Sequence, residues 1–368
     1  MAQGVTPDGI AVHNRVEGTT ERKLHAKVVD NILGARTLWS RLQGNGKPFD
    51  GKTADFTVKI TDSGLGEFYS GMEELSGAAS DTTIELSYAH TAFAQPIVLP
   101  MLESFANAGP QQTIDLDQFK MDEAGQEAIQ KLGAAAYLTG AGDMPNGLEM
   151  LVDDGTNVTN LGGQSRGTYA ALDSTVTASG GTLTLAKWAT LEDATSASGI
   201  NSEHVTSWWT TPTIWSLYEQ LLAPAVRASY GEVGYQAVSV RGDTIVKSEA
   251  SLKGAAGFTV LSYRGKPVMK DDACTSGVLY GLNERYLYWM GRTSVPAKFK
   301  PHVRAVSLGT PTTMEGVAAA PSKNHGWFIQ NLQMSPTQAG MIGRYHVIGQ
   351  MVSTQGRRHG KLTGITGV

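Results

Sequence analysis

Strict alternation of apolar and polar residues marks two short runs in the first quarter of the chain. The apolar positions of the two runs are Phe56, Val58 and Ile60, and then Ile84, Leu86 and Tyr88. A period of two is typical of a strand with one buried face, so the two runs predict a long β-hairpin over residues 52–90. An isolated two-stranded ribbon is only marginally stable in water, and we therefore expect this hairpin to lie against a partner surface.

A helical period marks a long segment after the hairpin. Residues 115–139 carry an apolar stripe that includes Phe119, Ile129 and Leu132, and this spacing is that of one helix face. Asp115 has the side chain of a helix N-cap, and Gly140-Ala141-Gly142 ends the pattern. The segment predicts the clearest helix of the sequence.

Shorter elements fill the rest of the chain. A second helix begins at Pro212, and Pro224 should kink or end it. A third, weaker helix covers residues 187–195, and residues 28–38 have the spacing of a short amphipathic helix within an otherwise aperiodic arm. Short strands are predicted at 258–263, 267–270, 277–282 and 285–289, with two or three more within 327–353. Strands in runs, with the helices segregated from them, predict an α+β fold.

Composition excludes several classes of protein. Of the 368 residues, 43 are glycine and one is cysteine, and charged residues make up 17%, against a usual share of about 25%. The lone Cys274 excludes an internal disulfide, and no run of 18 apolar residues is present that could span a membrane. The sequence pI of about 6.1 excludes a strongly basic nucleic-acid-binding protein. No signal peptide is expected from Met1-Ala2-Gln3-Gly4, and the low charge suits a chain whose surface is largely covered by other chains.

Charge is distributed unevenly along the chain. Residues 61–119 contain no Lys or Arg, no Asp or Glu follows Glu315, and residues 15–47 are mainly basic. Two interpretations stay open: the segments balance one another inside one subunit, or they meet between subunits, where charge complementarity selects partner and register. The second interpretation predicts an interface with an acidic side made of Asp62, Glu67, Glu73, Glu74, Asp81 and Glu85. Its basic side consists of Arg22, Lys23, Lys27, Arg344, Arg357, Arg358 and Lys361.

Two short motifs suggest chemistry but lack the context that the chemistry needs. Residues 163–167 match the G-x-S-x-G nucleophile elbow around Ser165, yet the elbow needs a buried strand before it and a helix after it, and this segment is a Gly-rich loop. Gly360-Lys361 resembles the end of a phosphate-binding loop, but Leu362 stands where Ser or Thr is required. The basic cluster 357–361 has three interpretations: a solvated chain end, a contact with DNA, or a contact with an acidic neighbour.

The remaining polar and aromatic pairs have structural explanations. Asp153-Asp154 and Asp271-Asp272 are predicted to be turn residues, and Trp208-Trp209 is predicted to lie in the core. The sequence has no H-E-x-x-H or C-x-x-C motif. We therefore predict no catalytic residue, no metal site and no cofactor.

The order of the predicted elements resembles a known family. A basic arm, a long hairpin, one long helix, an α+β centre and late strands together resemble the major capsid protein of tailed phages, whose fold is called the Hong Kong 97 fold. The segments that support the resemblance are 146–148, 161–166, 208–212, 263–268 and 279–283. Each segment alone is a weak indication of the family. The resemblance rests on their order along residues 25–362.

The resemblance implies a division of the chain. It gives an arm at 1–50, the hairpin, known as the E-loop, at 51–92, and a peripheral domain at 93–186 with its spine helix at 115–139. An axial domain follows at 187–325, and residues 326–368 return to the peripheral domain and form the tail. In this family the hairpin lies over a neighbouring subunit.

The resemblance also implies a function and partners. It implies a virion shell protein that assembles in the host cytoplasm into pentamers and hexamers around double-stranded DNA, without a membrane. Its partners would be other copies of the chain, a portal and a separate scaffolding protein, because only about 50 residues precede the hairpin. A decoration protein is left open. The alternatives are a serine hydrolase that uses Ser165, or another self-assembling phage protein such as a tail tube.

Overall fold

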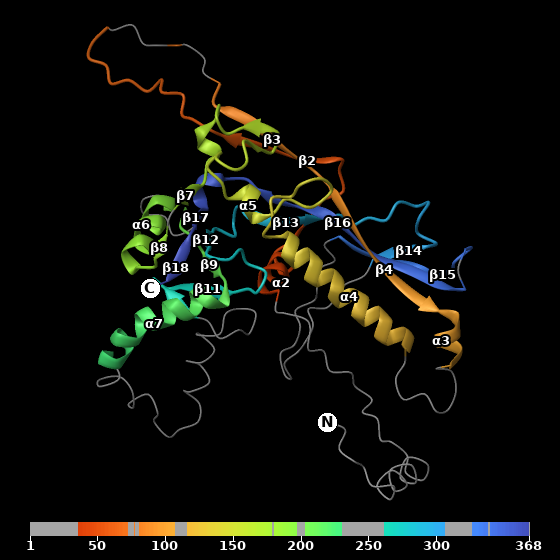
Figure 1. Ribbon diagram of the computed structural model, residues 1–368. Helices are drawn as coiled ribbons and strands as arrows, with labels where there is room; N and C mark the ends of the chain where they lie inside the picture. Colours follow the sequence, from red (N-terminus) through yellow and green to blue (C-terminus); the bar gives the residue numbers. More distant parts are fainter. Residues whose placement is uncertain are drawn as a thin grey trace, which may run out of the picture.

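Two six-stranded sheets and a hairpin carry the fold in the computed structural model (Figure 1). The structure describes residues 36–72, 77, 81–106, 116–178, 180–196, 203–229, 261–305, 326–337 and 339–367. Strands and helices are both well represented, so the α+β prediction is confirmed. No helix of the described residues is long and apolar enough to cross a membrane.

The first sheet has the order β1 (Lys47–Pro48), β13 (Leu287–Gly291), β16 (Gly340–Ser353), β15 (Trp327–Met334), β14 (Val303–Ala305). A further strand, β4 (Thr91–Pro100), pairs with β16 in antiparallel register. The helix α4 (Leu116–Ala135) runs beside β4 (Figure 1). Ile97 and Leu99 of β4 are buried, as are Ala124 and Ala128 of α4, so helix and sheet share one apolar layer. The short helix α3 (Met101–Ala106) follows directly after the last residue of β4.

The second sheet has the order β10 (Leu261–Tyr263), β11 (Lys266–Lys270), β9 (Ser207–Thr210), β12 (Leu279–Leu282), β17 (Gly360–Leu362), β7 (Thr175–Thr177). The helices α6 (Leu185–Thr195) and α7 (Pro212–Ser229) pack beside it. Trp208 and Trp209 are fully buried, which confirms the core prediction. Because successive strand residues point to opposite faces, Trp208 packs near Trp188 and Trp209 joins the core that lies toward α4.

The predicted hairpin is present. Its strands are β2 (Thr53–Lys59) and β3 (Thr83–Ala89), which pair in antiparallel register with Phe56 opposite Leu86. The remaining short elements are α2 (Thr37–Gly44), α5 (Leu148–Leu151), β5 (Asn160–Leu161), β6 (Gln164–Ser165), η1 (Ala170–Leu172), β8 (Gly181–Thr182), η3 (Gly356–Arg358) and β18 (Ile365–Gly367).

Two helix boundaries differ from the prediction. The helix α4 ends at Ala135 and not at residue 139, because backbone bonds between residues three apart turn the chain there and carry Tyr137 into the core. The chain then returns so closely that a Cβ on Gly147 would lie 2.0 Å from the Leu138 carbonyl oxygen. The helix α7 continues through Pro224 to Ser229. Pro224 therefore does not end the helix, and the alternative that it kinks the helix stays a prediction.

Part of the predicted arm helix lies outside the described residues. The described helix α2 begins at Thr37, where the Asp271 carboxylate accepts a hydrogen bond from the Leu38 backbone N–H at 3.0 Å. Asp271 also accepts from the Ala273 N–H at 2.9 Å, as expected of a turn residue. One buried aspartate therefore shapes its own turn and ties the arm to the second sheet.

The two sheets do not follow the expected division of the chain. Strands β13 and β14 fall within 187–325 yet belong to the first sheet, and β17 falls within 326–368 yet belongs to the second. The predicted domain division stays a prediction.

Candidate assembly surfaces

The base of the hairpin is fixed to its own subunit. The Tyr88 hydroxyl donates to the Ser353 carbonyl at 2.6 Å, and the Ser87 N–H donates to the Gly162 carbonyl at 2.9 Å. Gly162 has a φ of +54°, and a Cβ there would lie 2.9 Å from Leu86 Cβ, so only glycine suits this close approach. The base therefore has a partner surface within the chain, while the outward faces of its two strands and the loop beyond it are exposed.

The G-x-S-x-G motif forms the turn that receives the base of the hairpin. Ser165 is exposed in β6, which forms a tight hairpin with β5 through Gly162 and Gly163, and no α-helix begins directly after the serine in this described segment. The next residue, Arg166, is 1% exposed and donates to the backbone carbonyls of Asp153 and Met150. Burial lowers the pKa of Arg166, although nearby Asp153 and Asp173 oppose that shift. The sequence analysis missed Arg166, since nothing in the motif distinguishes a buried arginine from an exposed one.

Lys361 lies inside the subunit, which corrects its assignment to the interface. Its ammonium group is 3.1 Å from Asp153 Oδ1, and the two side chains are 3% and 0% exposed. Burial alone would raise the pKa of Asp153, but hydrogen bonds from the Val158 N–H and from Lys361 hold it below its usual value. Arg358 is also used within the chain, because its guanidinium lies 3.0 Å from Glu203.

The other predicted interface residues are placed as follows. Asp62 contacts Lys59 of the same hairpin, and Arg344 donates to Gln330 at 3.4 Å. Glu67, Asp81, Glu85 and Arg357 are exposed. Arg22, Lys23, Lys27, Glu73 and Glu74 lie outside the described residues.

His359, between Arg358 and Lys361, gives a prediction for acid stability. Its buried Nδ1 accepts from the Asn283 N–H at 3.2 Å, and burial lowers its pKa to about 3. The unfolded chain binds a proton near pH 6.5 and the folded chain does not, so the unfolding free energy should fall by about 1.4 kcal/mol per pH unit as the pH drops from 6 to 5. The substitution His359→Asn keeps an acceptor and should reduce the slope in urea unfolding by the share of His359, while His90 and His346, whose pKa values burial also lowers, keep theirs. An unchanged slope would contradict the assignment.

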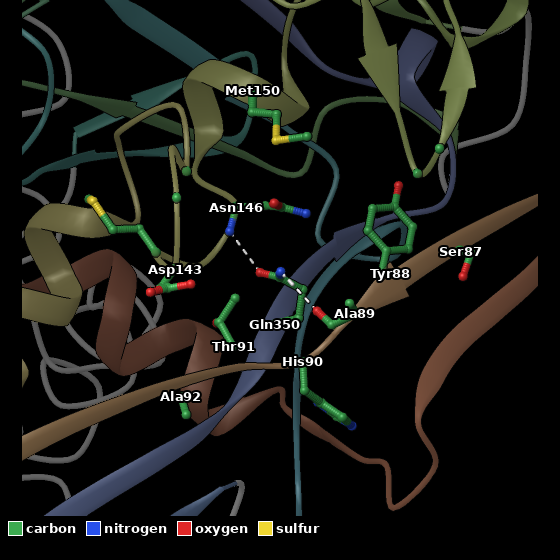
Figure 2. Close-up of a pocket in the computed structure, with 15 residues that line it drawn as sticks. Ser87, Tyr88, Ala89, His90, Thr91, Ala92, Asp143, Asn146, Met150 and Gln350 are labelled. Atoms are coloured by element: carbon green, nitrogen blue, oxygen red, sulfur yellow. Dashed lines mark hydrogen bonds between the residues drawn. The ribbon is translucent and has the colours of Figure 1, made fainter.

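A hollow of about 590 Å³ lies where the hairpin meets the segment after α4. In Figure 2 the Gln350 side chain crosses it: Oε1 accepts from the Asn146 N–H at 2.7 Å, and Nε2 donates to the Ala89 carbonyl at 3.0 Å. Ser87, His90 and Asp143 also line the hollow, but they lie well apart in Figure 2. The hollow is therefore a joint between elements and has no nucleophile paired with a base.

No metal centre is evident among the residues that the structure describes. No group of three or more His, Cys, Asp and Glu side chains there could hold an ion. Cys274 is buried, and burial with the nearby Asp271 charge raises the pKa of its thiol, which disfavours the nucleophilic thiolate.

Most of the exposed large apolar side chains of the described residues lie at two places far apart. Phe68, Tyr69 and Met72 of the hairpin loop are 108%, 65% and 106% exposed. Around α3 and the ends of β15 and β16, the exposed side chains are Val98, Met101, Leu102, Phe105, Met334 and Met341, with Phe299 between β13 and β14. Exposed apolar groups gathered in this way mark surfaces that bind other proteins.

Comparison with known proteins identifies the fold. No family model matches the chain, and no curated protein matches it. Among solved structures, the capsid of cyanophage A-1(L) matches with a TM-score of 0.66 and 14% identity over 96% of this chain and 99% of that one. The capsid of a native GTA particle matches with a TM-score of 0.59 and 12% identity, over 97% of this chain and 99% of that one. An encapsulin complex from Synechococcus elongatus matches with a TM-score of 0.57 and 10% identity, over 97% of this chain and 95% of that one. The chain has the Hong Kong 97-type fold of such shell-forming proteins.

Proposed function

We propose that this chain is the major capsid protein of a tailed phage. It assembles into pentamers and hexamers that form an icosahedral head shell around double-stranded DNA. The observation that carries the proposal is the extent of the likeness, because the match to the cyanophage capsid covers 96% of this chain at a TM-score of 0.66.

The exposed apolar side chains support assembly. A subunit that stayed alone in water would keep four large apolar side chains exposed to solvent: Phe68, Met72, Leu102 and Phe105. Covering them with other copies removes that apolar surface from water. In this proposal a portal and a separate scaffolding protein are further partners, the DNA contact is weak and non-specific, and the shell assembles in the host cytoplasm.

Particle size and content test the proposal. Purified protein should scatter light as particles far larger than the 39.1 kDa subunit, and negative-stain images should show closed shells. Shells from infected cells should protect DNA from nuclease. Because an encapsulin is among the structural neighbours, shells that never hold DNA would contradict the phage assignment, and a stable monomer would contradict the function altogether.

Within this function Ser165 carries no chemistry. The substitution Ser165→Ala should leave assembly, the unfolding midpoint and labelling by a fluorophosphonate probe unchanged, because the side chain is exposed in a tight turn. Gly162→Val is the matched variant from the same turn. It should destabilise the subunit by about 1–3 kcal/mol through backbone strain and the clash with Leu86. Labelling that is lost in Ser165→Ala would instead support the hydrolase alternative.

A further inference from the structure

Both chain connections between the hairpin and the body meet at one contact. Residues 49–52 lead from β1 into β2, and His90 alone joins β3 to β4. The rings of Phe49 and His90 lie against each other, with centroids 4.9 Å apart. Residues 49–51, His90 and residues 291–294 are here called the hairpin joint. A change in the angle between hairpin and first sheet has to pass through this joint.

The first connection is fixed to the end of β13. The Phe49 N–H donates to the Gly291 carbonyl at 2.9 Å. The Asp50 carboxylate accepts from the N–H groups of Thr293 and Ser294, both at 3.0 Å, and from their two hydroxyl groups. Burial alone would raise the pKa of Asp50, but these hydrogen bonds hold it far below its usual value. Asp50 therefore keeps its charge and its partners in mild acid.

The second connection is held by β16 on both sides of His90. Gln350 Nε2 donates to the Ala89 carbonyl at 3.0 Å (Figure 2), and the Thr91 hydroxyl donates to the Gly349 carbonyl at 2.9 Å. The His90 side chain is half-buried, and both of its ring nitrogens are shielded from solvent. The backbone around His90 is thus fixed, and the ring is the part that is free to respond to its surroundings.

The surroundings of His90 favour its neutral form. Burial lowers its pKa and the Arg292 charge lowers it further, whereas the Gly51 carbonyl and the Asp50 charge oppose the shift. Asp50 already accepts four hydrogen bonds from residues 293 and 294, so its oxygens are largely occupied. The hollow of about 590 Å³ borders His90 on another side and is also lined by Asp143. A charged ring would be better hydrated in that hollow than in the joint.

We propose that His90 is a pH-sensitive latch of the hairpin joint. The neutral ring packs on Phe49 and holds the hairpin at one angle. A ring that takes a proton from solvent leaves Phe49 for the hollow, and the hairpin then samples a wider range of angles. The hydrogen bond from Tyr88 to Ser353 limits the opening, so the hairpin stays attached. Histidine suits such a device because it gains its charge near neutral pH.

Two nitroxide labels in one subunit test the latch. Thr83→Cys lies exposed on β3 and Gln126→Cys lies exposed on α4, while the native Cys274 is buried. Pulsed electron–electron double resonance should give a narrow distance distribution at pH 8 and one about twofold broader at pH 5. The midpoint should lie below pH 6.5, the usual pKa of histidine. Circular dichroism at both pH values checks that the subunit stays folded.

Three variants assign the response to His90. His90→Phe keeps a ring against Phe49 without a titratable nitrogen, so its distribution should stay narrow at pH 5. His90→Lys carries the charge throughout and should be broad already at pH 8; if it does not fold, His90→Phe decides. His346→Asn is the matched control, because His346 is also half-buried but lies near Gln330, outside the joint. It should respond to pH as the parent does.

Three results would overturn the proposal: no broadening in the parent at pH 5, the same broadening in His90→Phe, or loss of the response in His346→Asn. With a small fraction of labelled copies among unlabelled ones, the distance is read within one subunit. The test therefore gives its answer whether or not shells form, and it does not depend on the proposed function.

Discussion

Deletion of residues 63–80, with a short Gly-Ser link in their place, is expected to abolish shell assembly and to leave the subunit folded. The contacts that hold the hairpin come from its base, where Tyr88 binds Ser353 and Leu86 packs over Gly162. The loop instead carries exposed Phe68 and Met72, which are the groups available to another copy. Light scattering should show subunits or small capsomers, and circular dichroism should match the parent protein.

A graded variant separates loop chemistry from loop length. Phe68→Ser/Met72→Ser keeps every residue of the loop and removes two apolar side chains, so it should raise the protein concentration needed for assembly. Tyr69→Phe is the matched control and should assemble normally. Normal shells from the full deletion would count strongly against the assembly role of the hairpin.

Removal of Lys361 is expected to have the largest effect on folding. Asp153 is fully buried against it, and breaking a buried ion pair by removing one partner costs about 3–5 kcal/mol, because the other charge stays uncompensated. Lys361→Met should lower the unfolding free energy by about that amount in urea titrations of unassembled subunits. Asp153 would still accept from the Gly155, Asn157 and Val158 N–H groups, which favours the lower end of the range.

Two further variants check the origin of this effect. In the double variant Asp153→Asn/Lys361→Met both charges are gone and an acceptor for the backbone remains, so much of the lost stability should return. Asp193→Asn removes a surface partner of Arg264, which lies 2.7 Å away with both side chains well exposed, and should cost only about 0–1 kcal/mol. A Lys361→Met protein as stable as its parent would show that the pair does not hold β17 to the loop after α5.

The sequence allowed the hairpin and the helical segments to be predicted because each is a local periodic pattern. It did not predict β4, whose run Thr91–Pro100 contains Pro96 and Pro100. Proline cannot donate to a sheet ladder, but an edge strand tolerates it, and in the described part of the chain β4 pairs with β16 alone. Edge position is a tertiary property that no local pattern contains.

The charged sites were harder to predict than the fold. Arg357, Arg358 and Lys361 form one basic cluster in sequence, yet Arg357 is exposed, Arg358 contacts Glu203 and Lys361 is buried with Asp153, a residue 208 positions away. Burial decides which charges remain for a partner, and burial here depends on contacts between distant segments.

Cryo-electron microscopy of the purified, assembled protein tests the central claim most directly. We predict closed icosahedral shells with five-fold and six-fold capsomers, in which the β2–β3 hairpin of each subunit extends over the first sheet of its neighbour. A protein that stays monomeric at high concentration, or that forms open tubes without five-fold vertices, would contradict the account.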